Sequence, residues 1–224
     1  MTISLQTGAR KRKGEPHMRR AVFGKSPGIL PPIFRNDVHM AVWQRQIAST
    51  LISKSELLAA RGLINHQMTV SVAKLGCLQE RLSFLEPYPR LKEDIQLLTE
   101  MFSCLFDPKY IGLRLTTLTE AMCPRFHVDK VSCRLITTYV GAGTEWLPYH
   151  DVDRSKLGAG CGGRADADSG LYPSAQCIQT LTSGDVALLK GESWESNEGA
   201  GLVHRSPAVE PAQQRLLLTL DSIS

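Results

Sequence analysis

The sequence has no apolar run long enough to cross a membrane. A membrane-spanning helix needs about 18 or more consecutive apolar residues, and no stretch of the 224 residues approaches that length. The N-terminal charges are also not followed by the apolar segment of a secretory signal. We therefore expect a cytoplasmic protein without a membrane partner.

Closely spaced cysteine pairs are lacking as well. The six cysteines lie at positions 77, 104, 123, 133, 161 and 177, and none of them form the Cys-x2–4-Cys pair of a zinc knuckle. In a chain without a secretory signal, reduced thiols are expected rather than disulfides. No GxxxxGK[ST] phosphate-binding loop is present, so nothing indicates a nucleotide-hydrolysing enzyme.

Excess positive charge is confined to the N-terminal segment. The formal net charge is +4, and residues 1–35 hold eight of the 26 Lys and Arg residues but one of the 22 acidic residues. The rest of the chain is slightly acidic and has no basic footprint for nucleic acid. The run at residues 10–13 could contact an anionic partner, but a short basic terminus is usually solvated. We expect residues 1–35 to form a flexible basic tail, with at most an anchoring segment near residues 29–34.

Residues 36–224 are expected to form a single domain whose first part, residues 36–108, is helical. Asn36 or Asp37 can cap a helix that continues to about residue 53, with a further helical stretch closed by Gly62. An apolar stripe opposite charged residues predicts another helix over about residues 89–105. We expect these helices to brace a sheet rather than to carry the chemistry.

From residue 109 onward the pattern changes to short strands. Runs of strand-forming residues are separated by Gly, Pro, Asp and Asn. The predicted strands are residues 112–118, 134–140, 175–181, 186–190 and 215–220. Because no helices intervene, an antiparallel sandwich or barrel is expected over residues 109–224. The glycine-rich residues 158–170 are expected to form a loop over the mouth of this barrel.

A His-x-Asp motif precedes the second of these strands. In an extended segment His127 and Asp129 point to the same face, so they can offer a nitrogen and an oxygen to one ion. A third candidate ligand, His204, lies in the stretch GLVHRSP. Two histidines and one carboxylate, with open positions opposite, form the ligand set of non-haem Fe(II) oxygenases. We predict that His127, Asp129 and His204 bind a metal ion and form the catalytic centre.

The order of these residues resembles that of the 2-oxoglutarate/Fe(II) dioxygenases. The resemblance implies a double-stranded β-helix, which is a cupin-like jelly roll, and it implies Fe(II) with 2-oxoglutarate as co-substrate. It further implies that Arg215 binds the far carboxylate of 2-oxoglutarate, with Tyr139 as its hydroxyl-bearing helper. Many dioxygenases carry Ser or Thr two residues after this arginine, where the present chain has Leu217. Arg134 or Arg205 could compete for the same role.

Four stretches resemble signatures of a bacterial family named domain of unknown function 1826 (DUF1826). They are CPRFHVD, TTYVGAGTEWL, GDVALLKG and HRSP, within about residues 110–221. The genes of this family are often associated with zinc-homeostasis genes. No reaction is assigned to this family, so the resemblance by itself predicts none.

These patterns predict an α+β protein: a jelly-roll barrel braced by N-terminal helices, acting as an Fe(II)/2-oxoglutarate-dependent oxygenase that hydroxylates an unknown substrate. One alternative is a non-enzymatic, cupin-like metal-binding protein linked to metal homeostasis. It would hold Zn through Cys123, His127 and either Cys133 or His204, because thiolates are good Zn ligands. Another is a barrel that has lost its chemistry and acts through its surface.

Two other polar stretches are candidates for a site. Residues 150–153, with the sequence HDVD, could form a second cluster, but a solvated loop is the expected structure. Glu145 and Trp146 could line the mouth of the pocket, or Trp146 could pack the end of the barrel.

Overall fold

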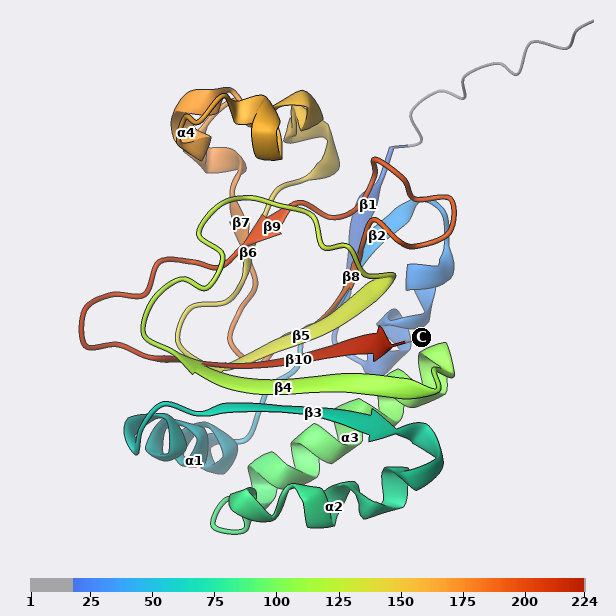
Figure 1. The fold of residues 1–224 in the computed structure, drawn as a ribbon, viewed down its shortest axis with the longest axis vertical. Helices are drawn as coiled ribbons and strands as arrows, with labels where there is room; N and C mark the ends of the chain where they lie inside the picture. The colour runs from blue at the N-terminus through green and yellow to red at the C-terminus, as the bar shows by residue number, and fades with distance from the viewer. Residues whose placement is uncertain (1–17, 224) are drawn as a thin grey trace, which may run out of the picture.

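The computed structural model describes residues 18–223, which form two β-sheets of unequal size and a layer of helices (Figure 1). The larger sheet has seven strands in the order β1-β2-β8-β5-β10-β4-β3, and the smaller has three in the order β7-β6-β9. The larger sheet consists of β1 (Arg20–Gly24), β2 (Val38–Trp43), β3 (Asn65–Ser71), β4 (Tyr110–Leu118), β5 (Cys133–Val140), β8 (Val186–Lys190) and β10 (Arg215–Ile223). The smaller sheet consists of β6 (Glu145–Trp146), β7 (Gln179–Thr180) and β9 (His204–Arg205).

Helices cover one face of the larger sheet, below it in Figure 1. They are α1 (Ser49–Ala60), the single turn α2 (Leu78–Arg81) and α3 (Pro89–Phe106). The buried side of α3 carries Leu91, Ile95, Leu98 and Phe102 at the three- and four-residue spacing of one helix face. These side chains join the main hydrophobic core, together with Leu216, Leu218 and Leu220 of β10. The remaining short helix, α4 (Asp166–Ser169), lies beyond the smaller sheet.

The other face of the larger sheet turns toward the smaller sheet. Because side chains alternate along a strand, β5 sends Leu135 and Tyr139 into the helix-side core and Ile136 into a second core. This second core also contains Leu217 of β10 and Trp146 of β6. Only alternate residues of β5 and β10 therefore reach the space between the two sheets.

Most of the predicted elements beyond residue 88 are confirmed. The strands expected at residues 112–118, 134–140, 186–190 and 215–220 correspond to β4, β5, β8 and β10, and the helix expected at residues 89–105 corresponds to α3. The central strand pairs β4–β10, β10–β5 and β5–β8 are antiparallel, as predicted. Residues 175–181 differ, because they form a 3₁₀ turn followed by only two strand residues.

The first part of the chain is less helical than expected. Residues 38–43 form the strand β2, and residues 65–71 form the strand β3, so the interpretation of residues 36–108 as a helical part is wrong there. The first five residues of β2 are all buried between β1 and β8. A strand covered on both faces has a nearly continuous apolar run, which periodicity alone does not distinguish from a buried helix.

The expectation of a flexible tail over residues 1–35 is also wrong for its second half. Residues 20–24 form β1, which pairs in parallel with β2, and two 3₁₀ turns follow at residues 27–29 and 31–34. The predicted anchor near residues 29–34 is confirmed, because Leu30 and Ile33 are fully buried. The tail prediction for residues 1–17 lies outside the described residues.

Within residues 18–223, no helix is long and apolar enough to span a membrane. The longest, α3, has 18 residues and carries charged side chains on its outer face.

Candidate metal centre and active-site pocket

The backbone places His127 and His204 side by side. His127 lies in the segment between β4 and β5, and it forms an isolated antiparallel bridge with His204 at the start of β9. Each backbone N–H donates to the carbonyl oxygen of the other residue at 3.0 Å. The two imidazole rings consequently lie with their centroids 4.7 Å apart. A pairing between segments 77 residues apart thus builds the centre of the site.

Asp129 completes a group of three candidate ligands. One ligand atom from each of His127, Asp129 and His204 can be chosen so that all three lie within 4.8 Å of one another. The carboxylate oxygens of Asp129 are 3.6 Å from His127 Nε2 and 3.3 Å from His204 Nε2. The structure therefore brings together the three residues predicted as metal ligands.

The other ring nitrogen of each histidine is held by the backbone. His127 Nδ1 lies 2.9 Å from the carbonyl oxygen of Arg125, and His204 Nδ1 lies 3.2 Å from that of Leu202. A carbonyl oxygen only accepts, so each contact favours the tautomer in which Nδ1 carries the proton. The Nε2 lone pairs are then free to bind a cation, as in metal sites whose histidines donate their second N–H to a carbonyl.

Arg134 holds the carboxylate of Asp129. Its Nη1 donates to Asp129 Oδ2 at 2.7 Å, while its Nε and Nη2 bind the two oxygens of Asp221 at 2.8 Å each. Burial alone would raise the pKa of Asp129, but the adjacent imidazoles of His127 and His204 and the charge of Arg134 hold this pKa well below its usual range. The group is thus supplied with a charged, oriented carboxylate.

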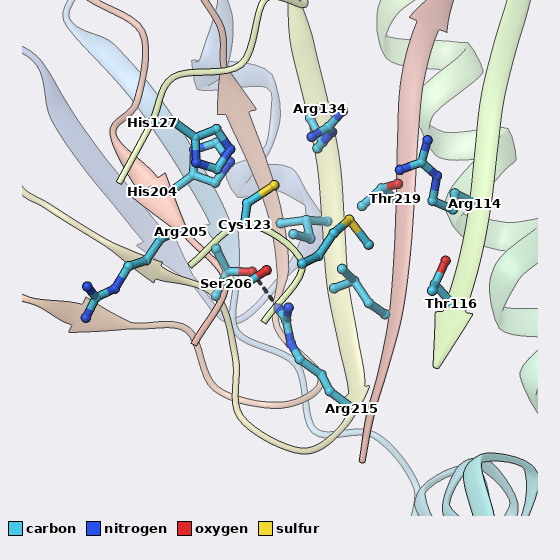
Figure 2. Close-up of a pocket in the computed structure, with 14 residues that line it drawn as sticks. Arg114, Thr116, Cys123, His127, Arg134, His204, Arg205, Ser206, Arg215 and Thr219 are labelled. Atoms are coloured by element: carbon cyan, nitrogen blue, oxygen red, sulfur yellow. Dashed lines mark hydrogen bonds between the residues drawn. The ribbon is translucent and has the colours of Figure 1, made fainter. Parts of the chain in front are cut away.

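Arg215 is a buried cation in the same pocket, which is drawn in Figure 2. Its side chain is 1% exposed, and it donates to the carbonyl oxygen of Ala142 at 2.8 Å and to the hydroxyls of Thr138 and Thr144 at 3.1 and 2.7 Å. Among residues 18–223 no carboxylate lies within salt-bridge distance of it. Burial without a compensating charge lowers the pKa of Arg215 to about 10. Such a guanidinium is suited to bind an incoming carboxylate.

The two competing arginines already have acidic partners. Arg134 is bound by Asp129 and Asp221. Arg205 Nε donates to Glu145 at 2.6 Å, and its guanidinium lies 4.3 Å from the centroid of the Phe126 ring. Of the three arginines considered for the clamp role, Arg215 alone lacks a carboxylate partner in the described part of the chain.

Comparison with known families decides the affiliation of the chain. A family model described as "Protein of unknown function (DUF1826)" matches residues 24–221. The chain belongs to the DUF1826 family. No curated protein matches this DUF1826 sequence.

Solved structures similar to this DUF1826 protein include oxygenases. The dioxygenase for auxin oxidation 1 from Arabidopsis thaliana, in its binary complex with 2-oxoglutarate, gives a TM-score of 0.51 at 9% identity over 92% of this chain and 93% of that chain. The corresponding dioxygenase from rice gives 0.49 at 12% identity over 92% and 83% of the two chains. Iron-bound HygX from Streptomyces hygroscopicus gives 0.45 at 11% identity over 82% of each chain. At identities this low, structural similarity indicates a shared fold and nothing more. This indication rests on the Arabidopsis structure, which has the highest TM-score of the three.

Tyr139 is not in the pocket of the DUF1826 protein, so its predicted role as helper of Arg215 is wrong. Its hydroxyl donates to Asp94 on α3 at 2.7 Å, on the helix side of the sheet. The alternation along β5 explains the error, since Thr138, one residue earlier, faces the pocket side and contacts Arg215. The contact of Thr144 with Arg215 was not predicted either, because a residue in a connecting segment belongs to no periodic sequence pattern.

One of the two predicted forms of a zinc site, the one that uses Cys133, does not fit the structure. Cys133 is 1% exposed and lies in the helix-side core, where burial raises the pKa of its thiol. Cys123 is exposed and lines the pocket, but neither thiol belongs to the group formed by the histidines and Asp129. A site that uses Cys133 is therefore excluded by the direction in which β5 points this side chain.

The remaining predicted features lie around the pocket rather than in it. Glu145 binds Arg205, and Trp146 packs in the core between the sheets. The glycine-rich residues 158–170 contain short helical turns, and Asp166 accepts a hydrogen bond from the backbone N–H of Phe126 at 2.8 Å. This segment thus packs against the His-x-Asp segment. Residues 150–153 lie on a separate surface hollow.

Proposed function

We propose that this DUF1826 protein is an Fe(II)- and 2-oxoglutarate-dependent oxygenase, built on a double-stranded β-helix whose walls are the two sheets. One observation carries the proposal: His127 and His204, which group with Asp129, share a pocket with the uncompensated guanidinium of Arg215. A cation-binding group and a carboxylate-binding group in one pocket match a metal enzyme that uses a keto acid.

The three side chains fit Fe(II). Two imidazole nitrogens and one carboxylate oxygen are ligands that iron accepts, and three protein ligands leave positions for the co-substrate and dioxygen. The hydrogen bonds from each Nδ1–H to a backbone carbonyl, and from Arg134 to Asp129, fix the direction of all three ligand groups before any metal binds. His127, Asp129 and His204 would hold the ion.

The surroundings of Arg215 fit the far carboxylate of 2-oxoglutarate. Thr138, Thr144 and the carbonyl of Ala142 hold the guanidinium in place, so that little side-chain freedom is lost when a carboxylate binds. Ile136 and Leu217 line the same pocket and keep it partly apolar, which strengthens the interaction between the guanidinium and a carboxylate. When bound, Fe(II) with 2-oxoglutarate and dioxygen supplies the oxidising chemistry of this class.

Anaerobic titration of the Fe(II)-loaded protein with 2-oxoglutarate tests the proposal. We expect saturable binding of one keto acid per chain, accompanied by a visible charge-transfer band. Arg215→Gln should weaken this binding by about tenfold or more, because a charge-assisted bidentate contact is lost. Arg90→Gln, which changes an exposed arginine on the helix layer, is the matched control and should bind as the wild type does.

Failure of the wild-type protein to bind 2-oxoglutarate would contradict the proposal. Tightly held zinc together with no response to the keto acid would instead favour a non-enzymatic metal-binding protein.

A further inference from the structure

The pocket contains one more uncompensated arginine than a keto acid requires. Four arginines line it: Arg114, Arg134, Arg205 and Arg215. Carboxylates neutralise Arg134 and Arg205, as described above. Within residues 18–223, neither Arg114 nor Arg215 has a carboxylate within salt-bridge distance. The co-substrate assigned to Arg215 therefore leaves the charge of Arg114 without a partner.

Arg114 stands on the wall of the pocket formed by β4 and β10. Its Cα partner across the strand pair is Thr219, and both side chains line the pocket. In Figure 2, Arg114, Thr116 and Thr219 group together, across the pocket from the two histidines. The guanidinium makes one long contact, 3.4 Å from Nη2 to Gln67 Oε1, so most of its donors are available to a ligand.

Thr116 supplies an independent sign of a polar ligand at the same wall. It follows Arg114 by two residues on the same face of β4, and it is 7% exposed. Its Oγ1 is buried and has no hydrogen-bond partner in the described part of the chain. Buried hydroxyls are nearly always satisfied by the protein, by water or by a ligand. A bound group that accepts from Arg114 could also accept from this hydroxyl.

We infer that Arg114 and Thr116 form a second oxyanion subsite, which binds a carboxylate or phosphate group of the molecule to be hydroxylated. This inference rests on the proposed function, because it assumes that Arg215 is taken by 2-oxoglutarate. Met122, Ile136 and Leu217 also line the pocket. The expected substrate is therefore an organic acid or phosphate ester with a small apolar body.

A binding experiment that does not depend on turnover tests this subsite. The full chain is loaded with Zn(II) in place of Fe(II), saturated with 2-oxoglutarate, and titrated calorimetrically with butyrate in one arm and inorganic phosphate in the other. We expect one further anion per chain, and the arm with the tighter binding identifies the group. Arg114→Gln should weaken this second anion by about tenfold or more while the affinity for 2-oxoglutarate changes less than about twofold.

Two further variants make the test specific. Thr116→Val keeps the shape and charge of the wall but removes the hydroxyl, and it should weaken the second anion by about threefold to tenfold. Arg90→Gln is the matched control for loss of an arginine outside the pocket and should have no effect. Circular dichroism of each variant verifies that the fold is retained.

Three outcomes would overturn the inference. They are the absence of a second anion in the saturated protein, an affinity for it that is unchanged in Arg114→Gln, and an Arg114→Gln effect that falls on 2-oxoglutarate instead. If the wild type fails to bind 2-oxoglutarate at all, the proposed function fails separately. The titration without keto acid then still tests the subsite, because anion binding must be lost in Arg114→Gln and retained in Arg215→Gln.

Discussion

Arg134 connects Asp129 of the candidate metal centre to Asp221 on β10. One guanidinium donates at 2.7 Å to the first carboxylate and at 2.8 Å, twice, to the second. The strand β10 also begins with Arg215, so a single element positions both the carboxylate of the metal group and the proposed co-substrate clamp. The orientation of Asp129 consequently depends on a residue that does not belong to the metal-binding group itself.

Replacing Arg134 with methionine should therefore weaken Fe(II) binding. The variant keeps a side chain of similar length but no donor, so Asp129 is no longer oriented. Loss of such a supporting contact typically costs about 10–100-fold in metal affinity. Anaerobic Fe(II) titration measures the effect. Asp221→Asn, which leaves the contact between Arg134 and Asp129 in place, should cost less, and equal affinities in Arg134→Met and the wild type would refute this role.

Tyr139→Phe should lower stability without changing the binding of 2-oxoglutarate. The hydroxyl of Tyr139 binds Asp94, which Arg45 also holds with two contacts of 2.5 and 2.9 Å, on the helix side of the sheet. Losing this hydrogen bond should cost about 1–2 kcal/mol in the free energy of unfolding. Denaturant unfolding and keto-acid titration separate the two effects. Thr144→Val is the comparison on the pocket side, and weaker keto-acid binding in Tyr139→Phe than in Thr144→Val would contradict the assignment.

Sequence reasoning predicted that His127 and Asp129 lie close together because spacing in an extended segment points both side chains to one face. It predicted β4, β5 and β10, which line the pocket, because these strands have strong strand composition. It could not find the pairing of Arg134 with Asp221 or the hydroxyl of Thr144, since these contacts join segments that are distant in the chain. The alternation of side chains along β5, by contrast, is sufficient to predict that Thr138 faces the pocket.

Strand β2 was not predicted, for a different physical reason. The side chains of β2 are buried in the cores on both faces of the sheet, and this tertiary environment overrides a pattern that also suits a helix. Local sequence does not contain the partner strands. Strand β3, with its polar alternate residues, was missed because its apolar positions are few.

Removal of the thiols should leave metal binding intact. Cys133 points into the helix-side core, and Cys123 lies outside the group formed by the histidines and Asp129. We expect Cys123→Ser and Cys133→Ala to bind Fe(II) and Zn(II) within about twofold of the wild type, while Cys133→Ala loses stability because it leaves a cavity. Titration with a thiol reagent provides the control: protection of both thiols by added zinc would contradict this account.

His39 should make the protein sensitive to acid. It is buried on β2, and burial, followed by the charges of Arg154, Arg19 and Lys190, lowers its pKa to about 3. The folded protein keeps His39 neutral, whereas the unfolded chain takes up a proton below about pH 6.5, so stability is lost as the pH falls from 6.5 toward 3. The slope from one such group is about 1.4 kcal/mol per pH unit.

Unfolding of His39→Leu and of the wild type at several pH values measures this contribution. We expect the free energy of unfolding of the variant to fall less steeply between pH 6 and pH 4. Measurements at pH 8, where His39 is neutral in both states, give the change that is due to packing alone. Identical slopes for the two proteins would exclude His39 as the source of the acid sensitivity.

The most direct test of the central claim is the Fe(II) stoichiometry of the protein reconstituted anaerobically, measured for the wild type and for His127→Ala. The proposed site predicts about one Fe(II) per chain in the wild type and none retained in His127→Ala, because the variant has lost one of three ligands. His150→Ala, which removes an exposed histidine outside the group, should bind as much iron as the wild type. Stoichiometric iron in His127→Ala would contradict the assignment of His127, Asp129 and His204 as the metal centre.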